Sequence, residues 1–220
     1  MKTLFKKLIW LVIAAPAVYL AIVWNKMPEK VAMHFDLLGN PDRYDDKKEL
    51  LIMTLVLIVM NAIVYLVLTN IYRLDPKKYA AENKQRLQSI ALAVATFLST
   101  VLFVIIYSSL KGSIKFHIGL IFSAVGLLFA IIGNYMQNLK PNYFAGIRLP
   151  WTLENEDNWK KTHRLAGKLF FASGLILAIL CLFTPPVASI IIFFTALLII
   201  ITIPCVYSYK MYKKQKLSGN

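Results

Sequence analysis

Five long stretches without Lys, Arg, Asp or Glu constrain this chain more than any other feature. They cover residues 8–25, 50–72, 87–110, 116–139 and 169–209, with lengths of 18, 23, 24, 24 and 41 residues. A helix needs about 20 apolar residues to cross a hydrocarbon core of about 30 Å. The last stretch is long enough for two helices, and Pro185 and Pro186 divide it because proline ends a helix. The pattern predicts six transmembrane helices.

The composition also favours a membrane protein over a soluble one. Hydrophobic residues make up 58% of the 220 residues and charged residues 16%. A soluble domain is about 45–50% apolar and about 25% charged. Disorder is excluded because disordered chains hold few apolar residues. We therefore expect an all-α, polytopic fold with no large soluble domain, surrounded by membrane lipid.

The positions of the 25 Lys and Arg residues predict the orientation. The N-terminus, the second and fourth loops and the C-terminal tail hold 18 of them, and the other three loops hold 7. Basic residues gather on the cytoplasmic side, so we expect both termini in the cytoplasm. Lipid headgroups can balance the net charge of +14, and no direct contact with nucleic acid is expected. The first apolar stretch continues eight residues past Ala17, which favours a retained anchor over a cleaved signal peptide.

The first outer loop has the pattern of a compact cap. Residues 30–35 can be extended, and a Gly-Asn-Pro-Asp turn signal follows them. Asp36 and Asp42 flank this turn and could pair with Arg43 or Lys47. The candidate residues of this loop are His34, Phe35, Asp36, Gly39, Asp42 and Arg43. An alternative is a metal site of His34, Asp36 and His117; their spacing matches no zinc signature, and a hydrogen-bonded structural histidine is the favoured interpretation.

The fourth loop, residues 140–168, holds the second unusual segment. Asn155 can cap a helix with an acidic first turn, and this helix would run directly into the fifth span. Trp159, Thr162 and His163 would then share one face of that helix.

Two interpretations of this inner loop stay open. Anchoring at the membrane interface explains its Trp and Tyr residues. Two arginines, a histidine and several amides could instead bind an anionic or peptide ligand. Gly146 permits a close approach or a positive φ. The candidate ligand or partner residues are Asn134, Asn142, Arg148, Pro150, Trp151, Thr152, Trp159, Thr162, His163 and Arg164.

The sequence contains no recognisable catalytic motif. The sequence has no His-Glu-x-x-His helix, no Gly-x-Ser-x-Gly elbow and no phosphate-binding glycine loop, so we predict no catalytic residue and no cofactor. Two alternatives remain. A small transporter could use the region of Asn61 and Asn134 as its path, or a membrane enzyme could act on a lipid or peptide near Arg148 and His163 at the inner face.

Two sets of motifs resemble a known family. The string GIRLPWTL at 146–153, Trp159 and the string THRLAG at 162–167 resemble the signature of the SdpI family of bacterial immunity proteins, and Asn134 and Met136 also fit it. The outer-loop residues Pro28, His34, Phe35, Gly39, Pro41, Asp42 and Arg43 resemble the small N-terminal domain of unknown function that often precedes this signature.

The resemblance implies a multi-pass protein of the bacterial cytoplasmic membrane. Such a protein would confer resistance to a secreted hydrophobic antimicrobial peptide, and as a signalling receptor it could sequester a cytoplasmic repressor. It also suggests three parts. Residues 1–72 would hold the first helix, the structured outer loop and the second helix. Residues 73–116 would hold an inner loop and the third helix, and residues 117–220 would form the SdpI-like region with helices four to six.

Overall fold

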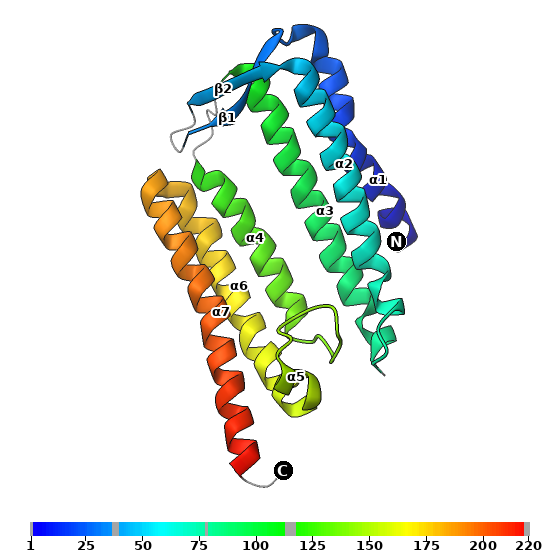
Figure 1. Ribbon diagram of the computed structural model, residues 1–220, viewed down its shortest axis with the longest axis vertical. Helices are drawn as coiled ribbons and strands as arrows, with labels where there is room; N and C mark the ends of the chain where they lie inside the picture. The colour runs from blue at the N-terminus through cyan, green and yellow to red at the C-terminus, as the bar shows by residue number, and fades with distance from the viewer. Residues whose placement is uncertain (1, 37–39, 78, 113–117, 218–220) are drawn as a thin grey trace.

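A computed structural model describes residues 2–36, 40–77, 79–112 and 118–217 and shows long helices with a small β-hairpin at one end (Figure 1). Six helices in these ranges are long and apolar enough to cross a membrane. They are α1 (Lys2–Val23), α2 (Lys47–Asn70), α3 (Ala80–Lys111), α4 (Ile118–Met136), α6 (Glu156–Phe183) and α7 (Pro186–Leu217). The short elements are η1 (Trp24–Lys26), β1 (Lys30–Phe35), β2 (Pro41–Asp46), η2 (Ile71–Arg73) and α5 (Pro150–Glu154). The predicted six-helix membrane protein is confirmed.

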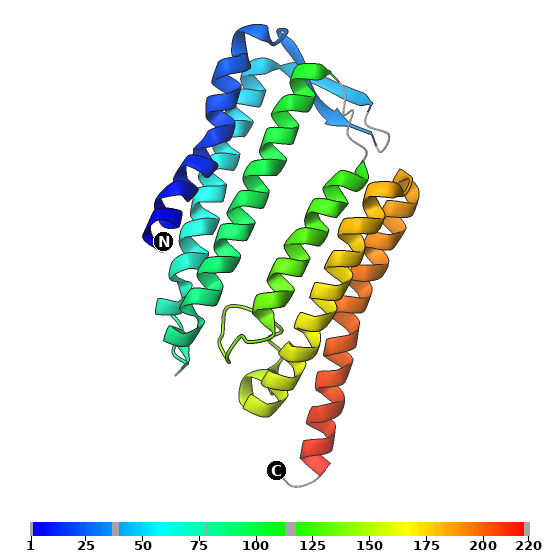
Figure 2. The same ribbon diagram turned by 180° about the vertical axis from the view of Figure 1, so that it is seen from behind.

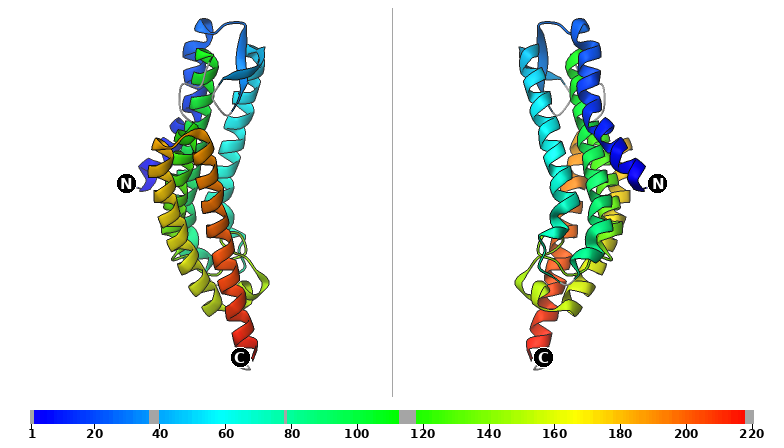
Figure 3. Two further views of the ribbon diagram at one scale, coloured as in Figure 1. Left: turned by 90° about the vertical axis from the view of Figure 1, so that its left-hand side faces the viewer. Right: turned by 90° about the vertical axis from the view of Figure 1, so that its right-hand side faces the viewer.

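The helices form two groups that stand side by side. α1, α2 and α3 pack together, as do α4, α6 and α7, and α3 meets α4 across the boundary (Figures 1 and 2). We call the end with β1 and β2 the hairpin end. The opposite end carries residues 137–155, between α4 and α6, and is called the loop end. There α7 reaches beyond the other helices (Figure 3). The cytoplasmic position of the termini and the three-part division of the chain stay predictions.

The helix ends follow from local chemistry. The Asp46 carboxylate accepts a hydrogen bond from the Lys48 N–H at 2.8 Å at the start of α2. The Asn155 side chain accepts from the Asn158 N–H at 2.8 Å, which confirms it as the N-cap of α6. α7 begins at Pro186, because proline is favourable in the first turn of a helix and not in its interior.

The hairpin is folded against the first helix group. β1 and β2 pair antiparallel, with Ala32 opposite Tyr44. Val31 and Ala32 are buried, and Ser109 Oγ of α3 donates a hydrogen bond to the Ala32 carbonyl at 2.7 Å. The predicted extended segment at 30–35 is therefore confirmed. β2 was not expected, because a proline and three aspartates give it little β propensity.

α4 and α6 lie almost backbone to backbone. A Cβ on Gly126 would stand 2.6 Å from the Gly174 carbonyl O, and a Cβ on Gly133 would stand 2.7 Å from the Gly167 carbonyl O. Small residues allow this close packing of helices in membranes. At the loop end of this interface Gly167 of α6 lies against Gln137, the residue that follows α4.

Candidate functional site

His163 is the centre of the loop-end structure. It is fully buried on α6 and its ring stacks on the Trp159 indole, with centroids 3.9 Å apart. Its Nδ1 lies 2.9 Å from the Trp159 carbonyl O, and its Nε2 accepts from the Ile147 N–H at 3.0 Å. A carbonyl only accepts and an amide N–H only donates, so these partners assign the proton to Nδ1 of a neutral ring. His163 thus fastens the 137–155 segment to α6.

Gly146 makes this contact possible. Its φ is +97°, a conformation that side chains with a Cβ rarely adopt. A Cβ at this position would overlap His163 Nε2. Both uses that the sequence suggested for this glycine, the positive φ and the close approach, are confirmed.

Other predicted residues fold the 137–155 segment and fasten it to α6. Trp159 Nε1 donates to the Leu139 carbonyl at 2.8 Å. The Asn142 carboxamide oxygen accepts from the N–H groups of Phe144 and Ala145 at 2.9 and 2.7 Å. The fully buried Thr152 hydroxyl accepts from the Leu149 N–H at 2.9 Å, at the start of α5. These groups therefore serve the conformation of the segment.

A second buried network ties α5 and α6 to α7. Asn158 Nδ2 donates to the Ser208 carbonyl at 3.0 Å, and Ser208 Oγ donates to Asn158 Oδ1 at 2.7 Å. Thr162 Oγ1 donates to the same Asn158 oxygen at 3.0 Å, and Trp151 Nε1 donates to Ser208 Oγ at 2.8 Å. Sequence patterns indicate Trp151 and Thr162 but not Asn158 and Ser208. The signals for these two are weak: Asn158 precedes a tryptophan, and Ser208 is a polar position in a largely apolar helix.

Residues near the start of α3 hold the segment from the other side. Asn83 Nδ2 donates to the Lys140 carbonyl at 3.0 Å, while the Lys140 N–H donates to Asn83 Oδ1 at 2.9 Å. Lys77 Nζ donates to the Leu153 carbonyl at 3.0 Å. These contacts could not be predicted from the charge-free stretch at 87–110, because α3 starts seven residues before it.

The remaining predicted inner residues are accessible. Asn134, Arg148, Pro150 and Arg164 are exposed, and Arg148 Nη1 donates to the Tyr143 carbonyl at 2.8 Å. Of the two residues named for the membrane-enzyme alternative, His163 has both ring nitrogens bonded inside the protein, and Arg148 is exposed.

Two adjoining clefts open at the loop end, and both are lined in part by α3. The larger, of about 390 Å³, also takes residues from the 137–155 segment and from α6. Its charged residues are Arg86, Lys140, Glu156, Asp157 and Lys160. The second, of about 350 Å³, shares Arg86 and Asn138 with it and also borders Asn134. Charges of both signs suit a polar or zwitterionic binding partner.

The two amides proposed as a transport path lie in different places. Asn61 is buried on α2, and its Nδ2 donates to the Ala95 carbonyl at 3.1 Å and to Ser99 Oγ at 3.0 Å. It therefore joins α2 to α3, the structural role expected of an intramembrane amide. Asn134 is exposed on α4 at the second cleft.

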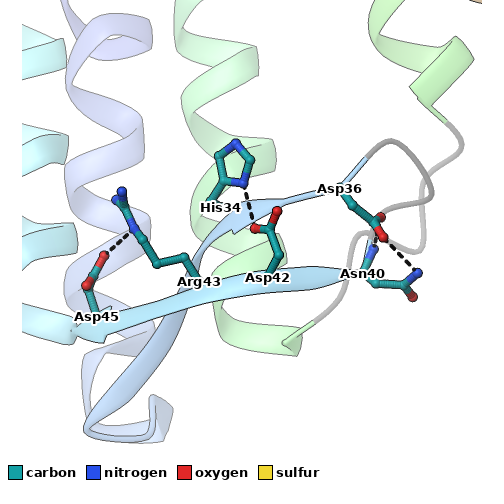
Figure 4. Close-up of polar contacts among 6 residues, drawn as sticks. All are labelled: His34, Asp36, Asn40, Asp42, Arg43 and Asp45. Atoms are coloured by element: carbon teal, nitrogen blue, oxygen red, sulfur yellow. Dashed lines mark hydrogen bonds and ion pairs between the residues drawn. The ribbon is translucent and has the colours of Figure 1, made fainter.

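The hairpin carries close polar pairs at its surface, two of which involve His34 and Arg43 (Figure 4). His34 Nδ1 lies 2.6 Å from Asp42 Oδ1, and Arg43 Nε lies 2.9 Å from Asp45. Lys47 pairs with Glu29 at 2.9 Å. We expected Asp36 or Asp42 to bind these two basic residues. The structure differs because residues two apart on a strand share a face, which places Asp45 beside Arg43.

The other candidate residues of the first outer loop are Asp36, Phe35 and Gly39, and His117 was the further candidate metal ligand. The Asp36 carboxylate accepts from the Asn40 N–H at 2.8 Å and Phe35 is half-buried, while Gly39 and His117 lie outside the described residues. In the described ranges no three His, Cys, Asp or Glu side chains come close enough to hold a metal.

Comparison with known proteins agrees with this arrangement. Residues 138–208 match the SdpI/YfhL protein family, and residues 11–60 match a domain of unknown function (DUF1648). The chain is 26% identical over 196 residues to Immunity protein SdpI of Bacillus subtilis (strain 168), and the match covers 88% of each chain. No solved structure matches the chain. The SdpI-family resemblance of this multi-pass bacterial membrane protein is confirmed: the match to the SdpI/YfhL protein family covers most of the loop-end network, and the match to the domain of unknown function covers the hairpin.

Proposed function

We propose that this chain is a membrane immunity protein that protects its cell from a secreted hydrophobic antimicrobial peptide. One observation carries the proposal. A six-helix bundle similar to Immunity protein SdpI along 88% of its length holds an organised hairpin at one end and an organised polar segment at the other. An anchoring role alone would not need both.

The hairpin end is the proposed peptide-facing side. Six of the 11 acidic residues lie in the loop that contains the hairpin, and the basic residues favour the loop end. This charge distribution supports an external hairpin. Tyr44 offers an exposed aromatic ring there, and the pair of His34 and Asp42 offers polar groups beside it.

The loop end is the proposed site for a cytoplasmic repressor. The exposed Arg148 and Arg164 and the mixed charges of the two clefts are the groups available to it. α3 physically connects the two ends, since Ser109 holds the hairpin and Asn83 holds the 137–155 segment. Because α3 contacts both segments, peptide binding at the hairpin could change the conformation of the loop end, as a receptor requires.

Expression of the chain in sensitive cells that lack it tests the immunity proposal. We expect survival to rise against at least one member of a panel of secreted hydrophobic peptides. Tyr44→Ala should reduce protection, while Leu74→Ala, which also truncates an exposed large side chain but at the loop end, should not. Equal amounts of each variant in the membrane fraction serve as the control. Unchanged killing across the panel would refute the proposal.

A further inference from the structure

A groove beside the C-terminal part of α7 shares no residue with the two loop-end clefts. It encloses about 520 Å³, and its lining includes the apolar or aromatic residues Leu149, Trp151, Val206 and Tyr209 and the basic residues Lys210 and Lys213. Apolar surface makes up most of its wall, and the two amines stand three residues apart on one side of the helix.

Several contacts hold the aromatic wall of this groove in place. The Trp151 indole N–H is bonded to Ser208 Oγ at 2.8 Å. Its ring also packs edge-on against Tyr209, with centroids 5.5 Å apart, and stacks on Tyr212, with centroids 5.4 Å apart. A fixed wall loses little conformational freedom when a ligand binds.

The groove lies at the depth of a membrane interface. α7 begins at Pro186 and has 32 residues, and about 20 of them suffice to cross the hydrocarbon core. Counted from Pro186, the core ends near Cys205, and Lys210 and Lys213 follow five and eight residues later, at headgroup depth. Trp and Tyr side chains at this level are typical of the interface.

We propose that this groove binds one anionic phospholipid of the leaflet at the loop end. An acyl chain would lie against Leu149 and Val206, and the phosphate would contact the amines of Lys210 and Lys213. The carboxylate of Glu154 borders a separate depression on another side of Trp151, so the lining of the groove itself is basic. The inference needs the chain to lie in a membrane and does not depend on the immunity proposal.

The full chain, purified in nanodiscs that contain equal amounts of phosphatidylglycerol and phosphatidylcholine of the same acyl length, provides the test. After release into detergent, native mass spectrometry counts the retained lipid. We expect one phosphatidylglycerol to be retained. The variant Lys210→Gln with Lys213→Gln should weaken its binding about thirtyfold, because each lysine at a membrane surface contributes a factor of about five. Val206→Trp, which fills the apolar part, should also displace it.

Lys214→Gln with Lys216→Gln is the matched control, since it removes the same charge from the same helix outside this groove. It should retain the lipid. Equal loss in both double variants would mean diffuse attraction to a basic tail and would overturn the site. Undiminished retention in Lys210→Gln with Lys213→Gln, or equal retention of phosphatidylcholine by the unaltered chain, would also overturn it. Unchanged melting temperatures establish that the variants are folded.

Discussion

The substitution Gly174→Ala tests the contact between α4 and α6 on which the loop-end network depends. A Cβ at Gly174 would stand 2.5 Å from the Ala130 N and 2.5 Å from the Gly126 carbonyl O. Ordinary contact begins at 3.4 Å, so the helices would have to separate by about 0.9 Å. Both contacted atoms belong to the backbone and cannot turn aside as a side chain would.

The cost follows from two opposing effects. Overpacking a well-packed interface costs about 1–3 kcal/mol. Alanine gains about 0.5–1 kcal/mol over glycine within a helix, which offsets part of that cost. We expect a net loss of about 1–2 kcal/mol, which corresponds to a melting temperature lower by roughly 2–8 °C in a chain of this size. Gly133→Ala should destabilise the Gly174→Ala variant less than it destabilises the unaltered chain, because the helices have already moved apart in that variant.

Thermal unfolding of the purified chain in detergent, followed by circular dichroism, measures this loss. Ala172→Leu is the control because it adds more volume to an exposed position of the same helix, and it should leave the melting temperature unchanged. If Gly174→Ala melted at the original temperature, or if Ala172→Leu were the more destabilising variant, the two helices would not be in backbone contact and the reasoning would fail.

Three further predictions concern the loop end and the orientation. Gly146→Ala should destabilise the chain by about 1–3 kcal/mol, seen as faster proteolysis of the 137–155 segment. Asn83→Ala leaves the Lys140 N–H without its partner, while the Lys140 carbonyl keeps its hydrogen bond from Asn142 Nδ2. The change should cost about 1–3 kcal/mol, measured as faster hydrogen exchange at the Lys140 amide; an unchanged rate would contradict the assigned contact. In a cysteine-free background, a membrane-impermeant thiol reagent should label Tyr44→Cys in intact cells and Arg148→Cys only after permeabilisation. Labelling of both in intact cells would refute the orientation.

Much of the fold could be predicted because its signals are local. Stretches without charge mark the spans, Asn155 marks the start of α6, and Pro186 marks the start of α7. Each signal acts within a few residues of where it is read, through the bilayer thickness or a single cap. β2 could not be predicted because its residues have little β propensity of their own. It forms by pairing with β1, which is itself packed on α3.

The partners within the site could not be predicted for the opposite reason. Asn83 and Lys140 are 57 residues apart, and Asn158 and Ser208 are 50 apart. No periodicity in the sequence links such positions, and a polar residue near a helix end gives the same pattern whether it faces water or a distant carbonyl. Sequence patterns therefore named Trp159 and His163 as neighbours on one helix face but not the backbone groups that they hold.

These occupied partners decide where a ligand of the loop end can bind. Thr152, Asn158 and His163 already use their polar atoms inside the protein, and breaking such a buried contact costs about 1–3 kcal/mol for each group left unpaired. A partner that contacted them would have to overcome this cost several times. Exposed side chains such as Arg148 and the residues of the clefts carry no such cost. The motif residues that resemble the SdpI signature therefore build the scaffold in large part, which is why the resemblance predicts the fold of this chain better than it predicts the ligand.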